Sequence, residues 1–168
     1  RLYWEKPAVG NYKGETFSYG QLATQIERFH IFFEACGIKK GERIAICAKN
    51  TARMAVSFLS VNTYETVVVP ILSDFTPDSV NHLVDHSESV ILFTDNDIWA
   101  KLDISKMPLL RAVVSVNDFT LLHVADEKVR EAFASVSERF AQKYPMGFTG
   151  ENVTYNTDNW DDLDIINY

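Results

Sequence analysis

The stretch RIAICAKNTARMAVSFLSVNTYETVVVPI, residues 43–71, contains two short apolar runs, Arg43–Cys47 and Thr66–Ile71, separated by a helical pattern. Continuous apolar runs of this length are typical of strands covered on both faces in a parallel sheet. The segment Ala52–Tyr64 between them is predicted to be a helix, because its larger apolar residues recur at helical spacing. Its expected inner face is Met54, Phe58 and Val61. The stretch therefore predicts a strand–helix–strand unit.

The same alternation continues toward the C-terminus. Thr76-Pro77 is typical of a helix start, with Thr as the N-cap and Pro in the first turn. Strands are predicted over 90–93 and 112–116, with a short helix near 98–102 between them. Alternating strands and helices define an α/β fold, so we expect a parallel sheet of four or five strands with helices on both faces. The strands at Val67 and Val90 should not pair antiparallel, since a helix connects them.

Toward the N-terminus the pattern predicts a hairpin, with strands over 8–12 and 15–19 joined at Lys13-Gly14. Ser18 and Gln21 have the spacing of a capping box for the helix that follows. That helix should end at Cys36-Gly37, where glycine supplies the left-handed residue. The apolar residues expected on its inner face are Leu22, Ile26, Phe29 and Phe33.

The C-terminal third begins with one predicted long helix, Ala125–Tyr144, followed by a polar segment. Residues on one face of this helix are Val129, Phe133, Val136, Phe140 and Tyr144. Residues 145–161 are rich in Gly, Asn, Thr and Asp, and Asp164–Tyr168 resembles a buried strand. We therefore divide the chain into an α/β subdomain over 1–144 and an acidic loop with a terminal strand over 145–168.

Bulk composition limits the class of protein. The 168 residues suit one domain, and 46% hydrophobic with 23% charged residues is ordinary for a soluble globular domain. The net charge is −7, and residues 145–168 hold five acidic residues and no Lys or Arg. The nearly neutral remainder argues against a nucleic-acid partner and an anionic membrane surface. Two cysteines, Cys36 and Cys47, give no disulfide framework, and we expect a cytoplasmic location. No apolar run has the length of a transmembrane helix.

The candidate constellations do not make a catalytic site. His82 and His86 are four residues apart on a predicted helix and could share a metal, but they lie opposite the apolar face, so a solvated surface without a structural metal is favoured. His30 and His123 have no nucleophile at motif spacing. The acidic cluster 158–164 lacks the Gly and Glu of an EF-hand loop. Residues 147–150 are too short for a phosphate loop, and neither G-x-G-x-x-G nor G-x-S-x-G occurs.

Three stretches together resemble the N-terminal part of the adenylate-forming (acyl-activating) superfamily. Thr16–Leu22, TFSYGQL, is similar to its T-[FY]-[ST]-Y-x-[EQ]-L opening, and Gly37–Ile46, GIKKGERIAI, to its G-[VI]-x-x-G-D-R-V-A-[IL] turn and strand. The third, Val67–Phe93, carries the V-x-V-P and T-P patterns and the next strand in order. One departure is Tyr64-Glu65, where the family has Ala-Gly. Glu should make that turn energetically less favourable than Gly does.

The resemblance implies an ATP-dependent, AMP-forming acid–thiol ligase as the parent enzyme. It would convert a fatty acid, ATP and coenzyme A to acyl-CoA, AMP and pyrophosphate with Mg²⁺, and long-chain acyl-CoA synthetases are the most similar branch. Asp164–Tyr168 resembles the strand that leads into the family's phosphate loop, so we expect a truncated, inactive fragment. No residue matches a family catalytic, cofactor or metal position, and none is assigned.

Two hypotheses remain open: this ligase fragment, and a complete non-catalytic α/β module that binds a protein partner. A Gly/Ser/Thr-rich loop directly after Tyr168 would favour the first. Truncation should expose apolar side chains that find a partner, and we expect the tail to dock on its own sheet or to form a homodimer. The residues expected to carry that surface are Trp160, Leu163, Ile165, Ile166 and Tyr168.

Overall fold

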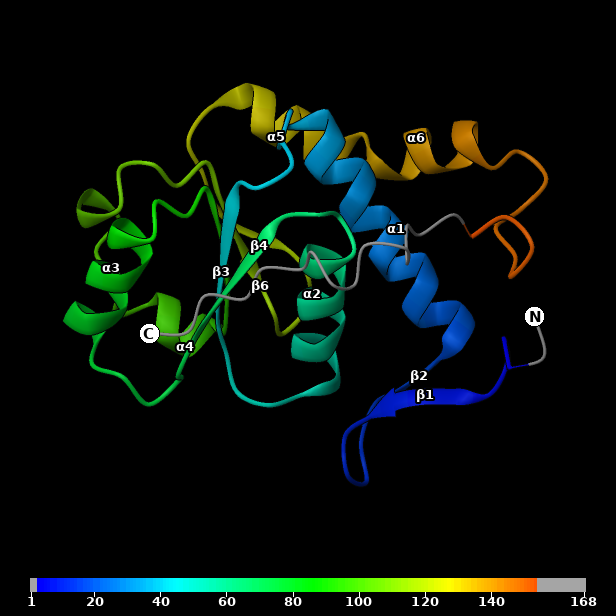
Figure 1. Cartoon of the computed structure of the whole chain (residues 1–168), viewed down its shortest axis with the longest axis horizontal. Coiled ribbons are helices and arrows are strands. Elements are labelled where there is room, and N and C mark those ends of the chain that lie inside the picture. The colour runs from blue at the N-terminus through cyan, green and yellow to red at the C-terminus, as the bar shows by residue number, and fades with distance from the viewer. Residues whose placement is uncertain (1–2, 154–168) are drawn as a thin grey trace.

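The structure is a computed structural model that describes residues 3–153 of the chain, and its centre is a five-stranded sheet (Figure 1). The strand order is β4-β3-β5-β6-β7. Strand β3 pairs in parallel with both β4 and β5, β5 pairs in parallel with β6, and β7 is antiparallel to β6. The strands are β3 (Arg43–Cys47), β4 (Val67–Ile71), β5 (Ile91–Thr94), β6 (Ala112–Ser115) and β7 (Leu121–Val124).

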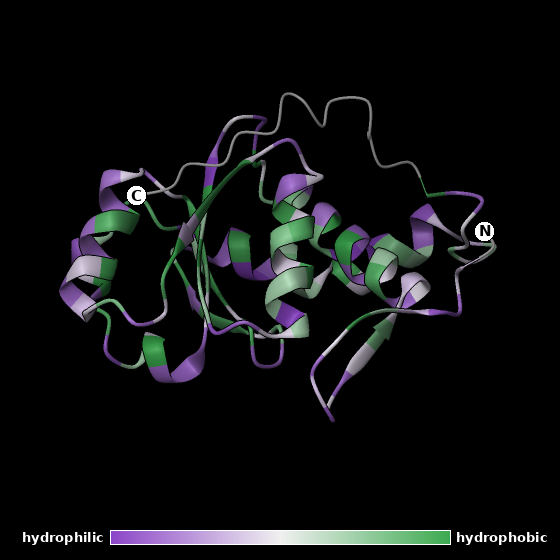
Figure 2. Ribbon diagram, turned by 60° about the horizontal axis from the view of Figure 1, so that its bottom comes forward, coloured by the Kyte–Doolittle hydropathy of each residue, from purple (hydrophilic) through white to green (hydrophobic). Residues whose placement is uncertain are grey.

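Helices cover both faces of this sheet, as the sequence predicts. The helices are α1 (Tyr19–Ala35), α2 (Ala52–Asn62), α3 (Pro77–His86), α4 (Asn96–Trp99), α5 (Glu127–Ala134) and α6 (Val136–Lys143), with a 3-10 turn at Ile104–Lys106. Helices α1 and α2 lie on one side of the sheet and α3 on the other (Figure 1). The strands themselves are almost wholly hydrophobic, whereas α3 mixes hydrophobic and hydrophilic residues (Figure 2).

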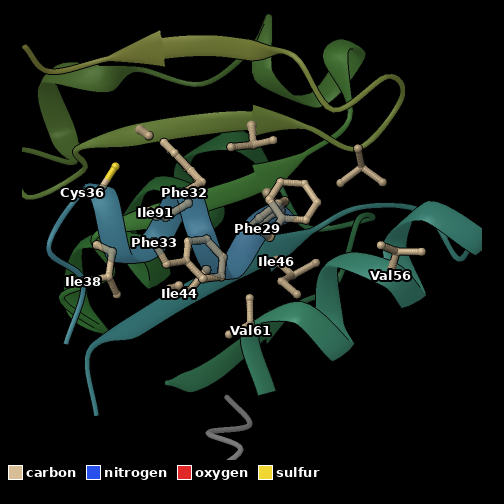
Figure 3. Packing of buried hydrophobic residues seen from close by; sticks show 14 of the residues in the cluster. Phe29, Phe32, Phe33, Cys36, Ile38, Ile44, Ile46, Val56, Val61 and Ile91 are labelled. Carbon is tan, nitrogen blue, oxygen red and sulfur yellow. The ribbon is translucent and has the colours of Figure 1, made fainter. Parts of the chain in front are cut away.

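The two faces form two separate hydrophobic clusters because successive strand residues point to opposite sides. Ile44 and Ile46 of β3 belong to the cluster under α1 and α2, while Ala45 and Cys47 belong to the cluster under α3. Figure 3 shows Ile44 and Ile46 packed with phenylalanines of α1 and valines of α2. Apolar residues are therefore required along β3 from Ile44 to Cys47, and this is why a continuous apolar run predicts the strand.

Helix α1 is buried on more than the one face that its period predicts. Its capping box forms as expected, with Ser18 Oγ accepting from the Gln21 N–H and Gln21 accepting from the Ser18 N–H. Ile26, Phe29 and Phe33 are buried as predicted, and so are Ile31 and Phe32. The additional burial arises because α1 packs against α2 on one side and against α5 and α6 on another. Leu22 is only partly buried.

The predicted long helix over 125–144 is two helices. Helix α5 ends at Ala134 and α6 begins at Val136, with Ser135 between them. The Ser135 hydroxyl donates to the Ala132 carbonyl at 2.9 Å and accepts from Arg139 Nε at 2.9 Å. A serine that bonds back to the preceding turn competes with the helical backbone ladder and bends a helix. The apolar face continues through the break, so the sequence pattern hides it.

Three further differences are small shifts. The predicted short helix near 98–102 lies earlier, as α4. The innermost residues of α2 are Val56, Ser60 and Val61, whereas Met54 and Phe58 are only partly buried. Strand β7 is absent from the predicted elements, although it contains His123. The N-terminal hairpin is confirmed as β1 (Pro7–Gly10) and β2 (Thr16–Ser18).

Helix α2 is followed by a residue in a strained conformation. Glu65 has φ of 61°, in the left-handed region that favours glycine. Its carbonyl accepts from the Gly41 N–H at 3.0 Å, and its carboxylate lies 3.4 Å from Lys40 Nζ. The turn therefore has the left-handed geometry for which the family uses Gly, and the Glu in this chain adopts it.

Strand β4 forms one edge of the sheet and contains Pro70. The Val67 N–H donates to the Glu42 carbonyl that precedes β3. Because the direction of backbone groups alternates along a strand, the N–H groups of Val67, Val69 and Ile71 face β3, and positions 68 and 70 face outward. Proline therefore occupies a position where its missing N–H costs the sheet no hydrogen bond.

Candidate functional site

The carboxyl edge of the sheet is the first place to look for a site, because open α/β sheets bind ligands where the strand order reverses. Here the chain leaves β3 toward β4 on one side and leaves β5 toward β6 on the other. The reversal point therefore lies between the carboxyl ends of β3 and β5, and these are adjacent strands.

The residue at this point is Asp95, directly after β5. Its side chain is buried, and its carboxylate accepts hydrogen bonds from the Lys49 backbone N–H at 2.8 Å and from Asn117 Nδ2 at 3.3 Å. Beside it, Thr94 Oγ1 donates to the Cys47 carbonyl at 2.7 Å. Asn117 Oδ1 in turn accepts from the Asn96 N–H at 2.8 Å. These bonds join the loops that follow β3, β5 and β6.

The polar groups at the reversal point are thus hydrogen-bonded to other groups of the same chain. Lys49 extends its ammonium outward, where Nζ lies 2.8 Å from Asp97 Oδ2. Both side chains are exposed, and each partner shifts the pKa of the other, raising that of Lys49 and lowering that of Asp97 through their hydrogen bond. Such an exposed pair adds little stability. Among residues 3–153, the polar groups at this edge are therefore bonded to one another.

The structure brings His82 and His86 together and places His30 and His123 elsewhere. His82 and His86 are exposed on α3, with ring centroids 5.6 Å apart. His30 lies between α1 and α2, where its Nε2 is 3.0 Å from the Ser60 carbonyl and 3.0 Å from Thr63 Oγ1. Since a carbonyl only accepts, Nε2 carries the proton. Burial lowers the pKa of His30 to about 4. His123 lies in β7, its ring 6.0 Å from Trp99.

Neither cysteine is placed for nucleophilic chemistry. Cys36 and Cys47 are both buried, and burial raises the pKa of the Cys36 thiol to about 11 and that of the Cys47 thiol to about 12. A thiolate nucleophile requires the opposite shift. Residues 147–150 belong to an irregular segment after α6 in which Phe148 packs against Tyr144 and Trp4, and this is not a phosphate loop. The acidic cluster 158–164 and the terminal strand lie outside the described residues.

The described residues do not fit an ATP–Mg²⁺ site. Among residues 3–153, no three His, Cys, Asp or Glu side chains lie close enough to hold a metal ion. In the same part of the chain, no helix has the length and apolar character needed to cross a bilayer. The buried carboxylate of Asp95 is already bonded to backbone and amide donors, so it is not a free metal ligand.

Comparison with known proteins decides what kind of chain this is. The sequence pattern of the AMP-binding enzyme family matches residues 2–168. The chain belongs to this family. The resemblance drawn from Thr16–Leu22, Gly37–Ile46 and Val67–Phe93 is therefore confirmed.

Relatives within the AMP-binding family cover only part of the chain. An acetyl-coenzyme A synthetase of Desulfatibacillum aliphaticivorans is 29% identical over 90 residues, which are 52% of this chain and 14% of that protein. A crotonobetaine/carnitine–CoA ligase of Proteus mirabilis is 28% identical over 85 residues, 51% of this chain and 16% of that protein. The chain thus spans about a sixth or less of the length of these curated relatives.

A solved structure of a related fold covers nearly the full length of the chain. A long-chain-fatty-acid–CoA ligase from Archaeoglobus fulgidus superposes with a TM-score of 0.69 and 14% identity, covering 99% of this chain and 32% of that one. An identity this low shows a shared fold only. The α/β architecture with its N-terminal hairpin is therefore that of the N-terminal region of adenylate-forming enzymes, as the sequence predicts.

Proposed function

We propose that this chain supplies the N-terminal part of an ATP-dependent, AMP-forming acid–CoA ligase that acts on long-chain fatty acids. The observation that supports this most is the family match over residues 2–168. The overall reaction would convert a fatty acid, ATP and coenzyme A to acyl-CoA, AMP and pyrophosphate. Asp164–Tyr168, which resembles the strand leading to the phosphate loop of long-chain synthetases, supports the choice of substrate.

We further propose that the chain is inactive by itself. Its sequence contains no Gly/Ser/Thr-rich phosphate loop, and residues 3–153 do not fit a metal–nucleotide site. Backbone donors of such a loop offset the charge of a triphosphate, and Mg²⁺ adds to that effect. We propose that ATP, Mg²⁺ and coenzyme A bind to parts of the enzyme other than residues 3–153, and that the enzyme is cytoplasmic.

The structural contribution of the chain would be a rigid platform. The bonds from Asp95 to Lys49 and Asn117 join three loops at the carboxyl edge of the sheet. A site built on fixed elements holds its groups more accurately than one built on free loops. In this proposal, residues 1–144 form the platform and residues 145–168 lead toward the nucleotide, with homodimer formation through the latter as a further possibility to measure.

The test has two parts. The encoding gene is read beyond Tyr168 for a Gly/Ser/Thr-rich loop, and its full product is assayed for pyrophosphate release with palmitate or acetate in the presence of ATP, Mg²⁺ and coenzyme A. We expect the loop, activity that prefers palmitate, and no activity from residues 1–168 alone. Preference for acetate would overturn the substrate class. Absence of both loop and activity would favour the non-catalytic interaction module.

A further inference from the structure

A cavity of about 400 Å³ lies away from the polar cluster at Asp95, beside helix α1. Its walls come from α1, the first turn of α2, the turn between β6 and β7, and the start of α6 with the end of α5. This volume is at the small end of the range for ligand sites, about 300–1,000 Å³. It therefore suits a small molecule.

Aromatic rings form the apolar side of the cavity. Phe29 and Phe32 of α1 are buried at its base. Phe119 of the β6–β7 turn and Phe133 of α5 form other parts of its wall. Phe29 meets Phe119 edge-to-face with centroids 5.1 Å apart, and Phe32 meets Phe133 in the same way at 5.1 Å. The partly exposed rings of Phe119 and Phe133 therefore offer most of the aromatic contact to an apolar ligand, and the buried rings of Phe29 and Phe32 support them from below.

The position of Phe119 is maintained at a conformational cost. Its φ is 61°, in the left-handed region, where a bulky residue is a genuine outlier. The turn holds it there: the Phe119 N–H donates to the Ser115 carbonyl at 2.9 Å, and Asp118 Oδ1 accepts from the N–H and hydroxyl of Thr120. Strain of this kind concentrates at functional sites, where the surrounding structure enforces it.

Two arginines border the cavity, and their charges are compensated differently. Arg53 makes a two-pronged bond to Glu15, with Nε to Oε2 at 2.8 Å and Nη2 to Oε1 at 2.7 Å, and its guanidinium lies 5.1 Å from the Phe119 ring centroid. Arg28 donates to the neutral hydroxyl of Ser137 at 2.8 Å and lies 6.0 Å from the Phe140 ring centroid.

Among the described residues, the lining cation without a paired carboxylate is therefore Arg28. In the part of the chain that the structure describes, no carboxylate lies within 4.0 Å of the Arg28 guanidinium, whereas Arg53 has Glu15. Asp118, the acid of the lining, keeps its own negative charge because Thr120 is neutral, and the cation whose charge acts on it is Arg53. A guanidinium beside an aromatic floor favours an anion joined to an apolar body.

We propose that this cavity binds a small amphipathic monocarboxylate, with the carboxylate on Arg28 and the apolar body against Phe29, Phe32, Phe119 and Phe133. This site is separate from the adenylation chemistry proposed above and does not rest on it. It lies wholly within residues 3–153, so the 168-residue chain itself carries it.

The test uses 3-phenylpropionate as the probe, with 3-phenylpropanol as the uncharged analogue. Amide shifts of the labelled chain are followed by NMR during titration. We expect saturable binding with a Kd of about 0.1–5 mM, shifts concentrated on the β6–β7 turn and α5, and binding of the alcohol at least tenfold weaker. Failure to saturate, equal binding of the alcohol, or shifts centred on other elements would each overturn the proposal.

Two variants and one control locate the site. Arg28→Gln should weaken binding of the acid at least tenfold and leave that of the alcohol unchanged. Gln25→Trp, which fills the cavity from a partly buried position on α1, should abolish binding of both. Arg139→Gln removes an exposed arginine of α6 that does not line the cavity and should change neither. Melting curves check folding, and unchanged acid binding in Arg28→Gln and Gln25→Trp would refute the assignment.

Discussion

The backbone N–H of Lys49 donates to the buried carboxylate of Asp95 at 2.8 Å, and this bond joins the loops that follow two central parallel strands. Asp95→Ala should lower the free energy of unfolding by about 1–3 kcal/mol, because the Lys49 N–H and the Asn117 amide lose their charged acceptor and the loops lose the bonds that join them. Asp97→Ala, which removes the exposed partner of the same lysine, is the matched control and should have little effect. Urea titration measures both, and equal losses would show that burial at Asp95 is unimportant.

Glu65→Gly should stabilise the protein. The left-handed conformation at φ of 61° costs a non-glycine residue about 1–2 kcal/mol, while glycine costs about 0.5–1 kcal/mol in the unfolded chain. We expect a net gain of about 0.5–1 kcal/mol, since the exposed ion pair with Lys40 contributes little. Glu34→Gly, within the regular helix α1, should instead lose about 1 kcal/mol. A lower melting temperature for Glu65→Gly would contradict the strain argument.

His30 should make the protein acid-sensitive. Burial lowers its pKa to about 4, so between roughly pH 6.5 and 4 the unfolded chain binds a proton that the folded chain does not. Stability from this residue is complete above the unfolded value and falls as the pH drops to about 4, by up to about 3 kcal/mol. Urea titrations across this range should show a weaker pH dependence for His30→Gln. The exposed variant His82→Gln should behave as the wild type does.

Both thiols should resist thiol–disulfide exchange in the folded protein. Burial raises the pKa of Cys36 to about 11 and of Cys47 to about 12, so thiolate is scarce near neutral pH. Treatment with Ellman's reagent should release colour slowly from native protein and rapidly in concentrated guanidinium chloride. Immediate reaction of either thiol of the native chain with Ellman's reagent would refute the burial that the structure shows.

The isolated chain should not bind ATP. Its sequence has no phosphate loop, and the polar groups at the reversal point of the sheet are bonded to one another. Calorimetric titration with ATP and Mg²⁺ should give no heat of specific binding. A dissociation constant below about 100 μM, roughly −5.5 kcal/mol, would contradict the prediction.

Local rules are sufficient for much of this fold. The caps at Ser18 and Thr76 are specified by residues three positions apart, and the structure forms both. The buried strands are predictable because both faces of β3 need apolar residues. Strand β7 is not, because all four of its residues are only partly buried and its pairing depends on the turn at Phe119. The break at Ser135 likewise depends on the hydrogen bonds of its hydroxyl, and the pattern of apolar residues does not predict them.

The site-level contacts are harder to predict because they are distant in sequence. Lys49 and Asp95 are 46 positions apart, and only the strand order makes their loops neighbours. The charge balance of Arg28 and Arg53 depends on Glu15, which comes from the hairpin. The strained turn after α2 is the exception, since replacement of the family's glycine by Glu65 indicates it from sequence alone.

Pro70 bears on the solubility of the chain. A strand at the edge of a sheet exposes unpaired N–H groups that can pair with a strand of another chain, and such pairing leads to aggregation. Pro70 has no backbone N–H to donate outward, so a strand of another chain paired with β4 would lack one backbone hydrogen bond. Replacement of Pro70 by valine would restore a continuous row of valines with all its donors. Along the edge that β4 forms among residues 3–153, the wild-type proline therefore removes one hydrogen bond from any strand that adds there.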